Sequence, residues 1–151
     1  MKTKLSILLV AFATSLFAQN VPSVAVLDFD TRGYDEVERH QIIQKLTLEM
    51  INMSGYEVID NYDVEYISQR DDVDFTGCFS RICLKELGDK LDVDFILTGS
   101  MNLLGEKVST TVRLFDVKNG SFVNSANRNY VDVPKNDLLM AELTLNDMMG
   151  I

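Results

Sequence analysis

Two cysteines, Cys78 and Cys83, carry the most versatile side-chain chemistry in this 151-residue chain, and they stand together in the segment CFSRIC. A pair of thiols can hold a metal, exchange electrons or form a disulfide. Two thiolates without further ligands make a poor zinc site, because structural zinc takes four ligands. The C-x-x-C spacing of disulfide oxidoreductases is absent, so a catalytic disulfide is not expected. The compartment therefore decides whether the thiols are free or joined.

The first eighteen residues have the layout of a secretory signal peptide. Lys2 and Lys4 form a basic start, and an apolar run from Leu5 to Phe17 is broken only by Ser and Thr. This run is shorter than the ~20 residues that span a bilayer as a helix. We expect cleavage near Ala18, which leaves a mature domain of residues 19–151 without a transmembrane span. The expected location is the periplasm or the exterior of the cell.

Export changes the interpretation of the cysteine pair, because an even number of cysteines in a secreted chain favours a disulfide. We therefore expect Cys78 and Cys83 to be joined. The closed loop is short, so the bridge contributes ~2 kcal/mol of chain entropy and serves as a local staple at the start of a helix. No cysteine stands near Ala18, so we expect no lipid attachment there.

A second candidate chemistry lies in Asp28-Phe29-Asp30-Thr31, which follows an apolar run. This segment resembles the first motif of haloacid-dehalogenase-type phosphotransferases. The resemblance implies that Asp28 attacks phosphorus, that Asp30 is the acid/base and that both help to hold magnesium. The supporting groups could come from a set of polar residues further along the chain: Ser100, Lys85 or Lys90, and the pair Asp71-Asp72.

The order of these supporting residues along the chain does not match that family. The alternative is that Asp28 and Asp30 only end a strand and cap its turn, as short motif matches commonly do. We keep a magnesium-dependent phosphotransferase as an alternative hypothesis.

The other polar clusters indicate no site. His40 is the only histidine and stands on the polar side of a predicted helix. Asp71, Asp72 and Asp74 lack the spacing and the closing glutamate of an EF-hand. The glycines form neither a GxGxxG motif nor a P-loop. We expect no catalytic residue, no metal and no cofactor.

The amino-acid composition indicates which classes of protein this chain can belong to. Hydrophobic residues make up 46% and charged residues 25%, which is typical of one globular domain. The formal net charge is −9, so a nucleic-acid partner is not expected, because phosphate recognition needs clustered cations.

Five elements are predicted in the first part of the mature chain. Val21 to Asp30 is a strand whose nearly continuous hydrophobicity favours burial on both faces. Asp35 and Glu38 form a capping box for a helix to about Ser54, which Gly55 ends as a left-handed residue. The buried stripe of this helix is expected to include Ile43, Leu46, Met50, Met53, Ile42 and Ile51. A strand over Tyr56 to Asp60 and helices over Asn61 to Arg70 and Ser80 to Leu91 follow, the last with Ile82, Leu84 and Leu87 buried.

The second part changes to strict alternation. Strands are predicted over Phe95 to Leu104, Lys107 to Val117 and Ser121 to Val133. Asn119-Gly120 indicates a hairpin turn in which both residues take positive φ. Asn136 or Asp137 then caps a last helix through Leu139, Leu143 and Leu145. We expect an α/β fold in which a parallel β-α-β start joins an antiparallel three-strand meander in one mixed sheet covered by helices.

The chain also resembles a known family of bacterial envelope proteins. The segments VAVLDFDTRG and GYEVID, and the block from Leu87 to Val123 with LGDKLDVDFILTGS and VSTTVRLFDVKNG, resemble the domain shared by the curli-secretion lipoprotein CsgG and the amino-terminal domain of TolB. The resemblance covers nearly all of the mature chain. It implies a small α/β sandwich with a mixed sheet and a role in secretion pores, periplasmic protein contacts or activation of cell-wall synthases. It implies no active site, and neither a pore nor a complete TolB is expected.

The leading hypothesis is a non-enzymatic interaction module with an unidentified envelope protein as partner; self-association is possible. The segment Asn124 to Tyr130 could offer a sheet edge to that partner, or could be a solvated edge that binds nothing. Met148 and Met149 could form a docking surface, or belong to the core. A third hypothesis is a small-ligand pocket at the carboxyl ends of the parallel strands, near Asp28 to Gly33 and Asp60 to Tyr62.

Overall fold

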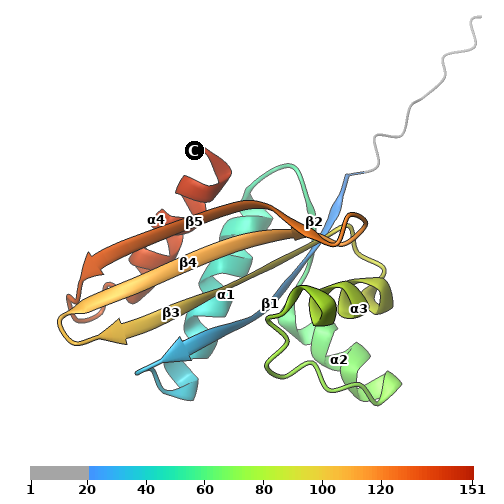
Figure 1. Ribbon diagram of the computed structural model, residues 1–151, viewed down its shortest axis with the longest axis horizontal. Helices are drawn as coiled ribbons and strands as arrows, with labels where there is room; N and C mark the ends of the chain where they lie inside the picture. Colours follow the sequence, from blue (N-terminus) through green and yellow to red (C-terminus); the bar gives the residue numbers. More distant parts are fainter. Residues whose placement is uncertain (1–20) are drawn as a thin grey trace, which may run out of the picture.

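The predicted order of strands and helices is present in the computed structural model, which describes residues 21–151 (Figure 1). The elements in chain order are β1 (Ser23–Arg32), α1 (Glu36–Asn52), β2 (Glu57–Ile59), α2 (Asn61–Asp71), α3 (Arg81–Leu91), β3 (Phe95–Leu104), β4 (Lys107–Asp116), β5 (Ser121–Val131) and α4 (Asp137–Met149). The signal peptide predicted over residues 1–18 lies outside the described residues. Within residues 21–151, none of the helices has the length and hydrophobicity needed to cross a bilayer.

The five strands form one mixed sheet in the order β2-β1-β3-β4-β5. β1 runs parallel to both β2 and β3, whereas β3, β4 and β5 form an antiparallel meander. The predicted α/β class with a parallel start and an antiparallel end is therefore confirmed. β2 and β5 are the two edge strands.

Helices cover the two faces of the sheet unequally. α1 and α4 lie side by side on one face, where Leu46 and Leu145 are fully buried against Phe29 and other strand residues. α2 and α3 lie on the opposite face, near the end of the sheet where β1 begins (Figure 1). There Leu84 and Leu87 pack against Ala25 and Ile96.

The predicted capping box at the start of α1 is confirmed. The Asp35 carboxylate accepts the Glu38 backbone N–H at 2.8 Å, and the Glu38 carboxylate accepts the Asp35 N–H at 2.9 Å. The helix ends close to the expected position near Ser54, but the capping role predicted for Gly55 is wrong. The helix stops at Asn52 with an extended Met53 as its cap, and the left-handed glycines of the described chain do not include Gly55. The chain therefore leaves α1 without a glycine turn.

Several residues that were expected in the core are exposed. Ile51 is 54% exposed and Ile82 is 77% exposed, and Leu139 and Leu143 are half exposed. The physical reason is the 100° step of a helix, which places these residues beside or opposite the buried stripe. The stripes that do face the sheet are Leu84, Leu87 and Leu91 in α3, and Met140, Ala141, Thr144, Leu145 and Met148 in α4.

The β4–β5 hairpin is present, but its predicted turn geometry is wrong. Asp116 pairs with Ser121, so the loop has residues 117–120 rather than two residues. Gly120 takes a positive φ of 63°, whereas Asn119 does not. The longer loop forms because the Asp116 carboxylate accepts the Asn119 backbone N–H at 2.8 Å, which closes a turn before Gly120 is reached.

Candidate functional site

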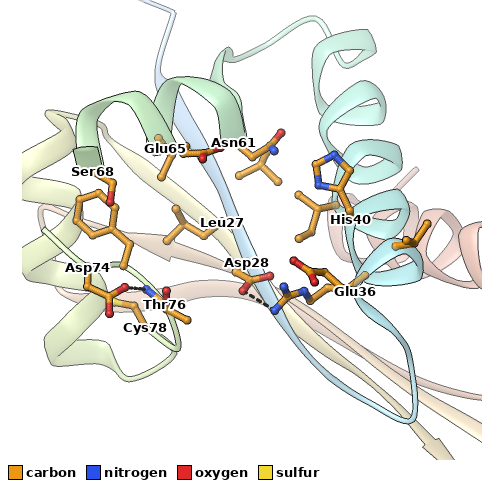
Figure 2. Close-up of a pocket in the computed structure, with 16 residues that line it drawn as sticks. Leu27, Asp28, Glu36, His40, Asn61, Glu65, Ser68, Asp74, Thr76 and Cys78 are labelled. Carbon is orange, nitrogen blue, oxygen red and sulfur yellow. Dashed lines mark hydrogen bonds and ion pairs between the residues drawn. The ribbon is translucent and has the colours of Figure 1, made fainter. Parts of the chain in front are cut away.

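The candidate site is a groove along the unpaired edge of β1. β2 has three residues and pairs with Ser23, Val24 and Ala25 only, whereas β1 continues to Arg32. A cavity of about 690 Å³ lies beside the part of β1 that β2 leaves open. Figure 2 shows side chains of α1 and α2 facing each other across this stretch, with the loop that follows α2 closing one end.

The walls of the groove combine apolar side chains with polar and charged ones. Val26 and Leu27 of β1 form its base and are buried in the sheet. Ile43 contributes from α1, Val64 from α2 and Phe75 from the loop after α2. Apolar surface beside polar groups that can orient a ligand is typical of binding sites.

The base of the groove is shaped by a β-bulge. The register between β1 and β3 shifts between Val26 and Phe29, so two residues of β1 oppose one of β3. The Thr98 hydroxyl of β3 donates to the Asp28 carbonyl at 3.2 Å, which directs the backbone of Asp28 toward β3. Because successive residues of a strand direct their backbone groups to opposite edges, the Phe29 N–H lies on the open edge.

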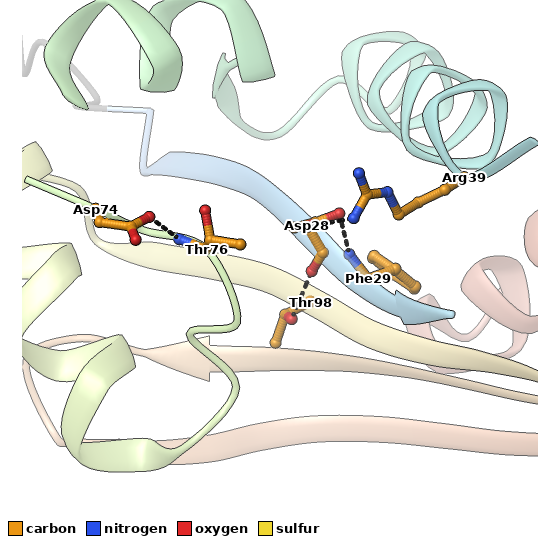
Figure 3. A network of polar contacts seen from close by, with 6 residues as sticks. All are labelled: Asp28, Phe29, Arg39, Asp74, Thr76 and Thr98. Carbon is orange, nitrogen blue, oxygen red and sulfur yellow. Dashed lines mark hydrogen bonds and ion pairs between the residues drawn. The ribbon is translucent and has the colours of Figure 1, made fainter. Parts of the chain in front are cut away.

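The Asp28 carboxylate occupies that open edge. One of its oxygens accepts the Phe29 N–H at 3.0 Å, and the other accepts a hydrogen bond from the Arg39 guanidinium at 3.3 Å (Figure 3). The side chains of Asp28 and Arg39 are both partly exposed. The carboxylate thus satisfies a backbone donor that the absence of a neighbouring strand leaves free.

The rim of the groove is acidic. Glu36, Glu65 and Asp74 line the cavity, and the basic groups beside them are Arg39 and His40. The Asp74 carboxylate accepts the Thr76 backbone N–H at 2.8 Å (Figures 2 and 3). Hydrogen bonds from Thr76 hold the pKa of Asp74 below its usual value, which stabilises its charged form.

The cysteine pair supports the loop side of the groove. Cys78 and Cys83 form a disulfide with their Cα atoms 5.5 Å apart, and Cys78 is buried. Cys83 lies in the first turn of α3, whose N-cap Ser80 accepts the Cys83 N–H at 3.3 Å. The bridge therefore ties the segment that carries Asp74 and Phe75 to the start of α3.

The residues of the phosphotransferase hypothesis are not brought together as one set. Asp28 faces Arg39, whereas Asp30 lies 3.7 Å from Arg32 and pairs in register with Ser100. The expected cation Lys85 forms an ion pair with Asp89 along α3, and Asp71 pairs with Arg70 at the end of α2. Residues 21–151 contain no group of three or more His, Cys, Asp or Glu side chains arranged to hold a metal.

The predicted ligand pocket agrees with the cavity in part. The cavity lies at the carboxyl end of β2 and is lined by Asp28 and Asn61, which belong to the two predicted segments. The sequence did not indicate Val37, Glu65 or Phe75. A signal was available in Asp60, which as the N-cap of a helix beginning at Asn61 limits the length of β2.

The predicted docking surfaces near the carboxyl terminus are only partly free. β5 is an edge strand, but one of its faces is fastened to α4 by Arg128, which pairs with Asp147 at 2.6 Å, and by Tyr130, whose hydroxyl lies 2.9 Å from that of Thr144. Met148 is 3% exposed and Met149 packs against the same core. Met148 is therefore a core residue, which is the second of the two alternatives given for it.

Comparison with known proteins shows the fold. No family model and no curated protein sequence matches this chain. Among solved structures, the LpoB C-terminal domain from Salmonella enterica matches with a TM-score of 0.63 at 11% identity, covering 74% of this chain and 84% of that one. Lipoprotein GNA1162 from Neisseria meningitidis matches with a TM-score of 0.61 at 18% identity, covering 85% and 96%.

TolB from Acinetobacter baumannii matches with a TM-score of 0.52 at 10% identity, covering 86% of this chain and 27% of that one. The resemblance to TolB is therefore present as a shared fold over part of that protein. At these identities the likeness concerns architecture alone, and the proposed relationship to CsgG stays a prediction.

Proposed function

We propose that this chain is a non-enzymatic protein-interaction module of the bacterial cell envelope, exported by the signal peptide predicted over residues 1–18. The observation that carries the proposal is the groove beside β1. It combines apolar walls, an acidic rim and a strand edge that β2 does not cover. Such a combination suits a segment of another protein, because an open strand edge offers backbone hydrogen bonds and the walls offer contacts for side chains.

Two further observations support the envelope location. The disulfide between Cys78 and Cys83 suits an oxidising compartment. One of the structures that share the fold, GNA1162, is a lipoprotein. The partner in this proposal is an envelope protein whose identity the groove alone does not specify.

Export and docking can be tested in one experiment in the native bacterium. A photo-crosslinking amino acid replaces Val37, which lines the groove and is 65% exposed. A matched chain carries it at Val123 of β5, which is 51% exposed and lies outside the groove. We expect periplasmic protein whose first residue follows Ala18 closely, and one discrete adduct from position 37 that position 123 does not give.

Two results would contradict the proposal. One is an unprocessed chain in the cytosol with both cysteines reduced. The other is the same adduct pattern from both positions, which would show that the groove has no preferred role.

The phosphotransferase alternative has its own test, because Asp28 does line the cavity. The purified protein is assayed with a generic phosphate ester and magnesium. We expect no turnover by the wild type. Activity that Asp28→Asn abolishes would instead favour phosphotransfer over docking.

A further inference from the structure

We propose that the groove binds one extended peptide segment of a partner protein, which pairs with β1 in the position that β2 vacates and sets a Lys or Arg side chain against the acidic rim. This inference rests on the proposed function and names the kind of segment that the groove takes. It also assigns a role to Asp28, whose carboxylate accepts the Phe29 N–H when no peptide is bound.

The first observation is the vacant strand position. β1 has ten residues and β2 has three, and their pairing ends at Ala25 and Ile59. β2 is not free to grow, because Asp60 caps α2 by accepting the backbone N–H groups of Tyr62 and Asp63 at 2.9 and 3.0 Å. The remaining edge of β1 is thus left for a strand from another chain.

The second observation is that helices flank the open strand position beside β1 on both faces of the sheet. An added strand directs alternate side chains to the two faces of the sheet. On one face they meet α1, where Val37 and Ile43 line the groove, and on the other they meet Val64 and Phe75. Because both faces of the added strand meet apolar side chains, the groove favours consecutive apolar residues in the peptide.

The third observation concerns the backbone groups that pairing needs. The bulge at Asp28 directs the N–H groups of Phe29 and, two residues later, Thr31 toward the open edge. Asp28 satisfies the first of them at 3.0 Å. A peptide carbonyl takes over the Phe29 N–H when the Asp28 carboxylate turns away, and that carboxylate keeps Arg39 as its partner.

The fourth observation is charge. Arg39 is already paired with Asp28, which leaves Glu36, Glu65 and Asp74 on the rim without an equal number of cations. The whole chain has a formal net charge of −9, which adds to the attraction for a basic segment. A basic residue in the peptide therefore raises affinity, and an acidic one lowers it.

The test uses protein recovered from the periplasm of cells that express the full chain. A phage-displayed library of random decapeptides is panned against it, and enriched peptides are synthesised for calorimetry. We expect sequences with a short run of apolar residues and at least one Lys or Arg. Replacing that basic residue by Glu should weaken binding at least roughly tenfold, an effect expected to shrink at high salt.

Backbone pairing is tested with a matched pair of variants. Thr31→Pro removes one N–H from the open edge of β1, a position where proline does not break the pairing with β3. Thr31→Val keeps the N–H. We expect Thr31→Pro to weaken the selected peptide at least roughly tenfold and Thr31→Val to leave it unchanged, with both variants melting near the wild type.

If Thr31→Pro fails to fold, a second pair replaces it. Asp28→Ala combined with Arg39→Ala frees the Phe29 N–H without leaving an unpaired cation in the groove, and should tighten peptide binding. The matched double variant Asp30→Ala, Arg32→Ala removes an ion pair that does not line the groove and should not change it. In the wild type, peptide binding should slow hydrogen exchange at Phe29 and Thr31.

Two outcomes would overturn this inference. One is that no peptide is enriched, and the other is that enriched peptides protect the amides of β5 instead of those of β1. Neither outcome removes the proposed function, because a groove-specific adduct at Val37 would still show docking by a folded surface. If the Val37 adduct is lost but the purified protein still binds the selected peptide, the proposed function in the cell is contradicted and the peptide-binding inference is not.

Discussion

The two edges of the sheet protect their unpaired backbone in different ways. The open part of β1 is recessed between α1 and α2, and the Asp28 carboxylate covers a free N–H. β5 relies on polar side chains, on a register shift at its start and on ties from one face to α4. Both devices discourage uncontrolled strand pairing, as natural edge strands require.

The difference shows which edge can select a partner. The side chains of a strand added to β1 would contact α1 on one face and α2 on the other, since these helices flank the position. A strand added to β5 would meet α4 on one face, while Ser125, Asn127 and Asn129 face away from that helix. The β1 edge therefore offers specificity, whereas the β5 edge offers mainly backbone pairing.

The largest expected effect lies at Gly99, which pairs with Phe29 behind the open edge. A Cβ at this position would overlap the Thr111 carbonyl oxygen and the Phe29 ring. We expect Gly99→Ala to lower the free energy of unfolding by about 3 kcal/mol or more, since overpacking against backbone cannot relax easily. Urea unfolding measures it. Asn129→Ala on β5 is the control and should cost less than about 0.5 kcal/mol; equal losses would show that the two sides are equally tolerant.

The next effect concerns the disulfide, which supports only the β1 side. Replacing both Cys78 and Cys83 by Ala should lower the free energy of unfolding by ~2 kcal/mol, because the unfolded chain regains the freedom of the closed loop. Hydrogen exchange should quicken in residues 73–79 and stay unchanged in β5. Faster exchange throughout β5 would contradict a local role for the bridge.

A smaller effect is expected at Tyr34, which connects the loop after β1 to α4. Its hydroxyl donates to the Asp137 carboxylate at 2.9 Å, and burial, this hydrogen bond and the nearby negative charge raise the pKa of Tyr34 well above its usual value. The folded state thus keeps the proton longer than the unfolded state, so the contribution is complete below about pH 10 and is lost as the pH rises further.

Tyr34→Phe should therefore lower stability by about 1 kcal/mol at neutral pH, and its stability should fall less steeply above about pH 10. Denaturant titrations across the alkaline range compare the two proteins. Identical slopes for variant and wild type would show that another group controls the alkaline loss.

The smallest effect is expected at the exposed ion pair between Arg128 of β5 and Asp147 of α4. Arg128→Ala should change the free energy of unfolding by about 0.5 kcal/mol or less, because exposed pairs are well solvated when separate. Thermal unfolding at low and high salt measures it. A loss above about 1 kcal/mol would show that the ion pair with α4 stabilises the β5 edge more than an exposed pair is expected to.

Local signals in the sequence determined the order of elements, the α/β class, the Asp35–Glu38 capping box and the position of the β4–β5 hairpin. Each depends on residues a few positions apart, whose spacing reflects the period of a helix or a strand. The same reasoning failed where a choice depended on packing. Ile82 and Met148 are both apolar residues of helices, but only the position of the sheet decides that Ile82 is exposed and Met148 buried.

The sequence indicated a pocket near Asp28 and Asn61, but tertiary structure decided the walls and the shape of the groove. Asp28 was visible in the sequence as a reactive carboxylate, but its contact with Arg39 and the open Phe29 N–H arise from a bulge opposite Thr98. The walls come from α1, α2 and the loop after α2. Sequence periodicity predicts each of these segments separately but does not predict their positions relative to one another. Their separation is set by how each helix packs on the sheet, so a cavity between them exists only once the whole fold has formed.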